Sequence, residues 1–200
     1  MFLYWSAVLR RVSVPGLALG AILGVGMATV DLVDGLGWRQ AASGAVTCLL
    51  LGYLVFALFV STSETVLAQR VARSHGGVPD AAMFRFPCAR EVRLPRKHSA
   101  TAAALANEVL GHARATNAVR IEQVLERGGG DVYLIAVGGA GARVAAHLDA
   151  VVEGEEVVVR IKARPLRCWK QLDGGASWGV ARALESCARA TLRERGLQRS

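Results

Sequence analysis

The chain has few side chains that could hold a metal ion or form a disulfide. Its 200 residues include four cysteines and four histidines, and no two of these stand at the close spacing of zinc sites or redox-active pairs. Cys48 falls inside an apolar run, where no disulfide is expected. We therefore expect reduced thiols, as in a cytoplasmic domain, with no bound metal and no cofactor.

Charge is scarce in the first 60 residues. Residues 12–30 and 41–60 contain no acid, base or histidine, and each has about the ~20 residues that an α-helix needs to cross the hydrocarbon layer. Residues 31–40 between them supply acids, glycines and Trp38 as a short loop. The pattern predicts an integral hairpin of two transmembrane helices at residues 1–63, with spans at about 12–30 and 41–60. Without ionisable side chains, the spans offer no relay for an ion or proton path.

Basic residues are distributed unevenly around these spans. Arg10 and Arg11 precede the first span, Arg70 and Arg73 follow the second, and Arg39 stands alone in the loop. Because bases gather on the cytoplasmic side, we expect both termini in the cytoplasm and the protein in the plasma (inner) membrane. A cleaved signal peptide is the alternative, but the residues before Arg10 are not a charged region and no small-x-small cleavage site follows.

Small residues recur at every fourth position of both spans. Such a face lets two helix backbones approach closely in lipid. We expect the two helices to pack on each other, and a homo-oligomer through the same face is the alternative. The glycines of this predicted helix packing are Gly16, Gly20, Gly24, Gly44 and Gly52.

Nearly all of the charge lies beyond the hairpin. Residues 69–200 hold 21 of the 24 Lys and Arg and 13 of the 16 Asp and Glu, which gives the whole net charge of +8. Residues 64–79 are expected to be a juxtamembrane linker, because the second helix should break at the glycines and proline of residues 75–79. Residues 80–200 then form a basic cytoplasmic domain, which could contact anionic lipid headgroups or an acidic protein partner.

The cytoplasmic domain is predicted to be α+β, in the order strand, helix, four strands, helix. The first strand, near residues 84–94, is placed at a sheet edge or is interrupted because Pro87 cannot donate a ladder hydrogen bond. Ser99 or Thr101 can cap the first helix, which should end near residues 116–117. An antiparallel sheet with both helices packed on one face would bury the apolar stripes in one core. The other strands are expected at residues 119–126, 132–137, 144–152 and 157–163, and the last helix at 177–195.

Residues 175–179 match the G-x-S-x-G pattern that can expose a nucleophilic serine before a helix. In that architecture the histidine follows the serine in the chain, whereas all four histidines here precede Ser177. The simpler interpretation is that Ser177 caps the last helix.

Gly138 to Gly141 follow an apolar strand pattern, as a dinucleotide-binding turn would. The third glycine of G-x-G-x-x-G is missing, because that position is Val144. Alternation in the residues that follow favours a hairpin turn instead. A non-catalytic chain is therefore preferred. The alternative function is a small membrane-bound hydrolase or nucleotide-binding enzyme that uses Ser177 or the Gly138–Gly141 turn.

One strand of the predicted sheet carries a row of bases on a single face. The bases continue past its end, with Trp169 among them, and nucleic acid is not expected because one isolated aromatic makes no stacking platform. The sequence predicts a membrane-anchored, non-catalytic module that binds a protein partner, an anionic lipid surface or a small ligand. The candidate contact residues are Arg160, Lys162, Arg164, Arg167 and Lys170.

Overall fold

The computed structural model describes residues 2–78, 83, 87–95, 101–167 and 172–197. By its internal contacts the chain divides into two compact units, Met1–Val66 and Leu67–Ser200. Each unit is described separately below.

The first unit is a hairpin of two long helices. Helix α1 spans Phe2–Val33 and helix α2 spans Trp38–Ser74, joined by a turn in which Gly35 adopts a φ of +80° that favours glycine. The last eight residues of α2 belong to the second unit. Both helices are long and apolar enough to cross a membrane, and the predicted spans lie within them.

Glycines line the contact between the two helices. A Cβ on Gly20 would lie 2.5 Å from the Leu49 carbonyl oxygen, and one on Gly24 would lie 2.6 Å from that of Ala45. Only glycine permits backbones this close. The outward sides carry large exposed apolar side chains, among them Val14, Ile22, Val25, Leu51, Val55 and Phe59.

The other glycines of the predicted packing face also lie within the hairpin. Gly16 faces Tyr53, and Gly52 faces Leu23 and the Gly20 backbone. A Cβ on Gly44 would lie 2.7 Å from Oδ2 of Asp31, an acid that is 7% exposed. The glycine face is therefore occupied by intramolecular packing.

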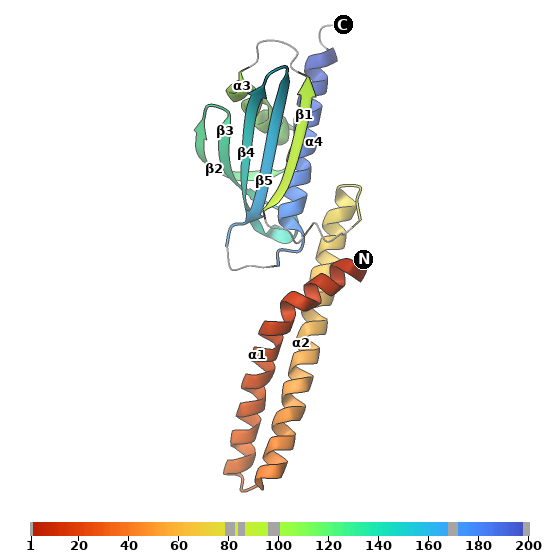
Figure 1. The fold of residues 1–200 in the computed structure, drawn as a ribbon, viewed down its shortest axis with the longest axis vertical. Helices are drawn as coiled ribbons and strands as arrows, with labels where there is room; N and C mark the ends of the chain where they lie inside the picture. Colours follow the sequence, from red (N-terminus) through yellow and green to blue (C-terminus); the bar gives the residue numbers. More distant parts are fainter. Residues whose placement is uncertain (1, 79–82, 84–86, 96–100, 168–171, 198–200) are drawn as a thin grey trace. The chain divides into compact units, whose positions relative to one another are not determined.

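The second unit contains a five-stranded antiparallel sheet in the order β1-β5-β4-β3-β2 (Figure 1). The edge strands are β1 and β2, and β1 starts directly after Pro87, which is the position expected for a strand next to proline. The strands are β1 Cys88–Pro95, β2 Arg120–Gly128, β3 Asp131–Val137, β4 Arg143–Glu153 and β5 Glu156–Pro165.

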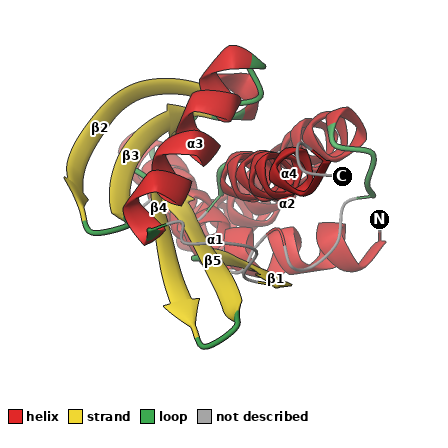
Figure 2. Ribbon diagram, turned by 90° about the horizontal axis from the view of Figure 1, so that it is seen from above, coloured by secondary structure: helices red, strands yellow, loops and turns green. Residues whose placement is uncertain are grey.

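Two helices cover one face of this sheet, as Figure 2 shows. Helix α3 spans Ala102–Ala115, and helix α4 spans Ala176–Leu197. Thr101 caps α3, its side chain accepting from the Ala104 amide at 3.3 Å. The fully buried core side chains include Leu105, Val109, Leu134, Leu148, Ile161 and Leu184. The structure confirms the predicted α+β class, the order of helices and strands, and the packing of both helices on one face of the sheet.

Helix α2 ends at Ser74, as the following glycines predict, and its residues 67–74, which fall in the expected linker of residues 64–79, group with the second unit. The expected start of the first strand, at residues 84–86, lies outside the described residues.

Candidate functional site

The residues of the G-x-S-x-G motif pack against the end of α2. A Cβ on Gly179 would lie 2.7 Å from Val71 Cγ1, and one on Gly175 would lie 3.5 Å from Ala68 Cα. Gly139, in the turn before β4, would likewise overlap Val71 if it carried a Cβ. We call Gly139, Gly175 and Gly179 the glycine seat. The glycine seat lets the end of α2 pack closely. This packing explains the glycines of the motif without a catalytic role.

Ser177 is not the cap of α4, contrary to the sequence-based interpretation. Asp173 accepts hydrogen bonds at the start of α4 instead: its carboxylate accepts from the Gly175 amide at 3.1 Å and from the Ser177 amide at 2.8 Å. The Ser177 side chain is fully buried, and within the described part of the chain its hydroxyl has no hydrogen-bond partner. A nucleophile needs a base within reach and access for substrate, and this geometry supplies neither.

The Gly138–Gly141 turn closes a hairpin. The Gly138 amide donates to the Ala142 carbonyl at 2.8 Å, and antiparallel β3 and β4 flank the short 3₁₀ turn η2 at Gly139–Gly141. A Cβ on Gly138 would lie 2.7 Å from that of Ala176. Since a strand follows the turn where a dinucleotide site needs a helix, the arrangement gives no support to nucleotide binding there.

The basic row lies on the sheet face opposite the helices, but it is partly neutralised. Arg160 is half-exposed and makes ion pairs with Glu91 and, at 2.5 Å, with Glu153. Lys162 and Arg164 are exposed on the same face of β5, and Arg167 is exposed beyond it. Lys170 lies outside the described residues. The row therefore presents fewer free charges than its sequence indicates.

A polar hollow of about 570 Å³ lies between the end of α2 and helix α4. Sequence analysis missed it, although Arg182, Glu185 and Arg189 recur at the helical spacing that puts them on one face. Its other side comes from a segment more than 100 residues away in the sequence, so no local pattern joins the two. The lining residues are Ser74, His75, Arg182, Glu185, Ser186 and Arg189.

One buried carboxylate organises the charges of this hollow. Glu185 is 8% exposed; it accepts from Arg182 Nη1 at 3.1 Å and from Arg189 Nη2 at 2.9 Å. Arg90 Nε lies 3.7 Å from the same carboxylate, which is ion-pair distance but too long for a hydrogen bond. Three guanidinium groups thus surround one acid, leaving two positive charges in excess.

The buried Trp178 ring lies close to two of these guanidinium groups. The Cζ atoms of Arg182 and Arg90 lie 5.7 Å and 6.0 Å from its ring centroid, within the range of cation–π attraction. The ring is 4% exposed, and its Nε1, like Arg90 Nε, is buried with no hydrogen-bond partner among the described residues. The cluster therefore has more hydrogen-bond donors than acceptors.

His75 lies against the same tryptophan, with the two ring centroids 6.1 Å apart and nearly perpendicular. Burial lowers the pKa of its imidazole, and the positive charge of Arg182 lowers it further. His75 and Ser74 also line a second hollow, of about 270 Å³, toward Asn117 and Gly138. At neutral pH His75 therefore contributes an uncharged imidazole.

The chemistry of the hollow is that of an anion site. Guanidinium groups and hydroxyls donate hydrogen bonds and attract negative charge. Among the described residues no three His, Cys, Asp or Glu side chains gather closely enough to hold a metal ion. The residues present fit a small, partly solvated anion.

Comparison with known proteins gave no relative from which a role could be transferred. Neither the models of protein families nor the curated proteins contain a match to this chain.

Proposed function

We propose that the chain is a membrane-anchored, non-catalytic binding module. The hairpin holds it in the plasma (inner) membrane with both termini in the cytoplasm, and the α+β unit presents the binding site there. The observation that carries this proposal is the hairpin's outer surface, where large apolar side chains such as Ile22 and Phe59 are exposed to the surroundings. Water would penalise that surface, whereas lipid tails solvate it.

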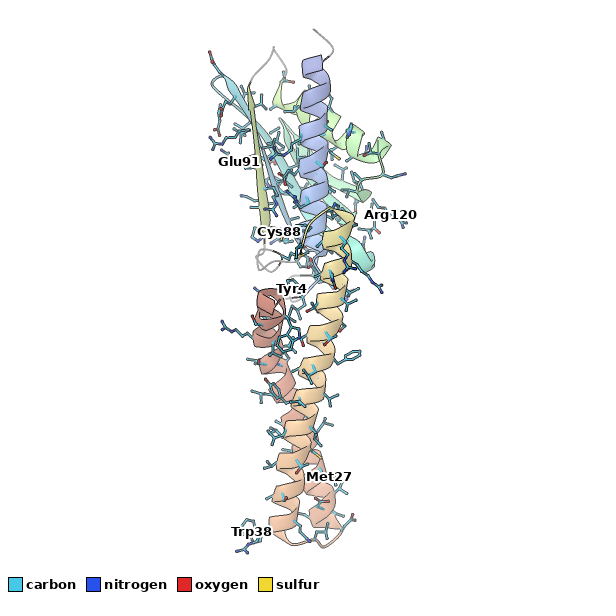
Figure 3. All side chains as sticks on the ribbon, turned by 90° about the vertical axis from the view of Figure 1, so that its right-hand side faces the viewer. Tyr4, Met27, Trp38, Cys88, Glu91 and Arg120 are labelled. Atoms are coloured by element: carbon cyan, nitrogen blue, oxygen red, sulfur yellow. The ribbon has the colours of Figure 1, made fainter. Side chains whose placement is uncertain are left out.

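The hairpin's loop end supports its placement across a membrane. Trp38 is 72% exposed and projects from that end in Figure 3, and Arg39 lies over its ring at 5.6 Å. An amphipathic tryptophan is favoured at the membrane–water interface. The cytoplasmic side then carries Arg10, Arg11, Arg70 and Arg73.

Membrane extraction and cysteine labelling test the proposal. The full chain is expected to stay in the membrane fraction of the expressing cells through alkaline carbonate extraction. An Asp34→Cys variant should react with an impermeant maleimide in intact cells, whereas Glu155→Cys, in the turn between β4 and β5, should react only after lysis. Extraction by carbonate, or the reverse labelling pattern, would refute it.

Within the domain, the polar hollow supports binding better than the basic row does. Arg160 is already paired with two acids, which leaves Lys162 and Arg164 as exposed bases without an ion pair in the described part of the chain. Exposed charges of this kind attract an anionic surface only weakly, at about 1 kcal/mol each. The row remains a secondary contact surface for anionic lipid or an acidic protein.

A further inference from the structure

We propose that the hollow lined by His75, Arg182 and Arg189 binds the phosphate group of a phosphate monoester. This deepens the binding role proposed above by naming its ligand chemistry.

The charge balance favours a dianion. Arg90, Arg182 and Arg189 carry three positive charges around the single carboxylate of Glu185, and the surplus of two matches a phosphate monoester near neutral pH, which carries about −1.5 to −2. Glu185 neutralises one of the three charges, and Arg182 and Arg189 line the hollow directly, so the uncompensated positive charge attracts an anion there.

The carboxylate of Glu185 also fixes the direction of two guanidinium groups. Arg189 uses Nε and Nη2 on Glu185 Oε1, at 3.2 Å and 2.9 Å, and Arg182 uses Nη1 on Oε2. A guanidinium has five N–H donors in a rigid fork, so both arginines keep donors for a second acceptor. Paired arginines held in this way suit the several oxygens of a phosphate.

The remaining lining is compatible with this ligand. Ser186 adds a hydroxyl, and the Ser74 hydroxyl already donates to the Val71 carbonyl at 2.8 Å. His75 is uncharged for the reasons given above and can donate from one ring nitrogen. A hollow of about 570 Å³ has the size of a small-molecule site and leaves room for the organic part of the ligand.

Two sources could supply such a phosphate: a soluble metabolite or the headgroup of phosphatidic acid. The test uses the full chain in a non-ionic detergent, titrated calorimetrically with glycerol 3-phosphate and with inorganic phosphate at constant ionic strength. A parallel arm uses nanodiscs of phosphatidylcholine with and without phosphatidic acid. Saturable binding up to roughly millimolar concentrations is expected in one arm, and the arm that responds identifies the source.

Substitutions locate the site. Arg182→Gln and Arg189→Gln should each weaken binding at least about tenfold, because each removes one charged donor fork. Arg114→Gln is the matched control: it removes the same charge from an exposed position of α3, outside both the hollow and the basic row, and should leave affinity within about twofold. Arg182→Lys, which keeps the charge but loses the fork, should weaken binding to an intermediate degree, and circular dichroism verifies that each variant is folded.

The proposal is overturned if neither phosphate arm shows saturable binding, or if Arg114→Gln weakens binding as much as Arg182→Gln does. The first result would make the arginines a structural network, and the second would make binding a general response to the positive charge of the domain. Because membrane extraction does not depend on these residues, either failure is distinguishable from failure of the anchoring role.

Discussion

Folding disfavours protonation of His75. Its imidazole pKa is lowered by burial and by Arg182, and Arg189 and Glu185 line the same hollow. In the unfolded chain the pKa returns to its ordinary value of about 6.5. Between the two values the unfolded state binds more protons than the folded state.

We therefore predict that His75 makes the domain less stable in mild acid. The stability that depends on a neutral His75 is fully present above about pH 6.5. It is lost as the pH falls through the lowered pKa of His75 in the folded state. The melting temperature of the detergent-solubilised chain should fall between pH 7 and pH 5, and more steeply than that of a His75→Gln variant. Parallel curves for the two proteins would contradict this assignment.

Residue-level reasoning from the sequence was accurate where the partner was local. Thr101 caps α3 through an amide three residues away, which a sequence pattern can show. The apolar helical pattern after Ser177 predicts that this serine is the cap, but the carboxylate of Asp173 accepts from the Gly175 and Ser177 amides instead. Both residues fit the local pattern for a cap, and the start of α4 at Ala176, which places Ser177 inside the first turn, decides between them.

At the scale of elements, the docking of the α2 end on the glycine seat can be tested with two glycines in helices. We predict that Gly179→Ala destabilises the domain, because its Cβ would lie 2.7 Å from Val71 Cγ1. Gly111→Ala is the control, since a Cβ there meets nothing within 4 Å in helix α3. Both changes gain helix propensity of about 1 kcal/mol, so that gain cancels between them.

The difference in unfolding free energy between these two variants should be about 1–3 kcal/mol, which is the usual cost of overpacking. Thermal unfolding of the full chain in detergent measures it. Equal stability of the two variants would show that Val71 does not pack on α4.

The hairpin offers a second matched pair, both members in α1. Gly20→Ala would place a Cβ 2.5 Å from the Leu49 carbonyl oxygen, whereas Gly26→Ala meets nothing within 4 Å. We predict that the first change loosens the hairpin by roughly 1–3 kcal/mol and the second does not. Crosslinking between cysteines placed on the two helices should fall for Gly20→Ala alone; if both variants crosslink like the parent, the glycine contact is unimportant.

Sequence patterns predicted the helices and strands well because each pattern arises from residues that are close together in the sequence. The two-residue alternation of β4 and β5 and the helical stripe of α3 reflect one buried face each. The glycines at residues 138–139 were predicted only as part of a turn, although both make room for a helix. Val71, which fills the space beside Gly139 and Gly179, comes from a helix far away in the sequence.

At the scale of the whole molecule, the division into an apolar hairpin and a basic α+β unit could be predicted from composition alone. The polar hollow could not, because residues 74–75 and 182–189 are far apart in the sequence and come together only in the folded domain. The basic row was visible in the sequence, but its neutralisation by Glu91 and Glu153 depends on strand register.

The assignment of Leu67–Ser74 to the folded unit bears on where the chain can be divided. We predict that a fragment of residues 67–200 is soluble and melts cooperatively, whereas one of residues 80–200 aggregates because the seat for Val71 is empty and apolar surface is exposed. Size-exclusion chromatography and thermal melts compare the two. Equal behaviour would mean that the helical segment adds no stability.

Gly76 and Gly77 follow the end of α2, where a protease cut would separate the domain from the hairpin. A cut there would leave Val71 and the rest of the docked segment attached to the hairpin. The released piece would lack part of its own core and the two residues, Ser74 and His75, that line the hollow opposite α4. Proteolysis at this loop would therefore destroy the domain, and a shed form that still functions would have to be cut before Leu67.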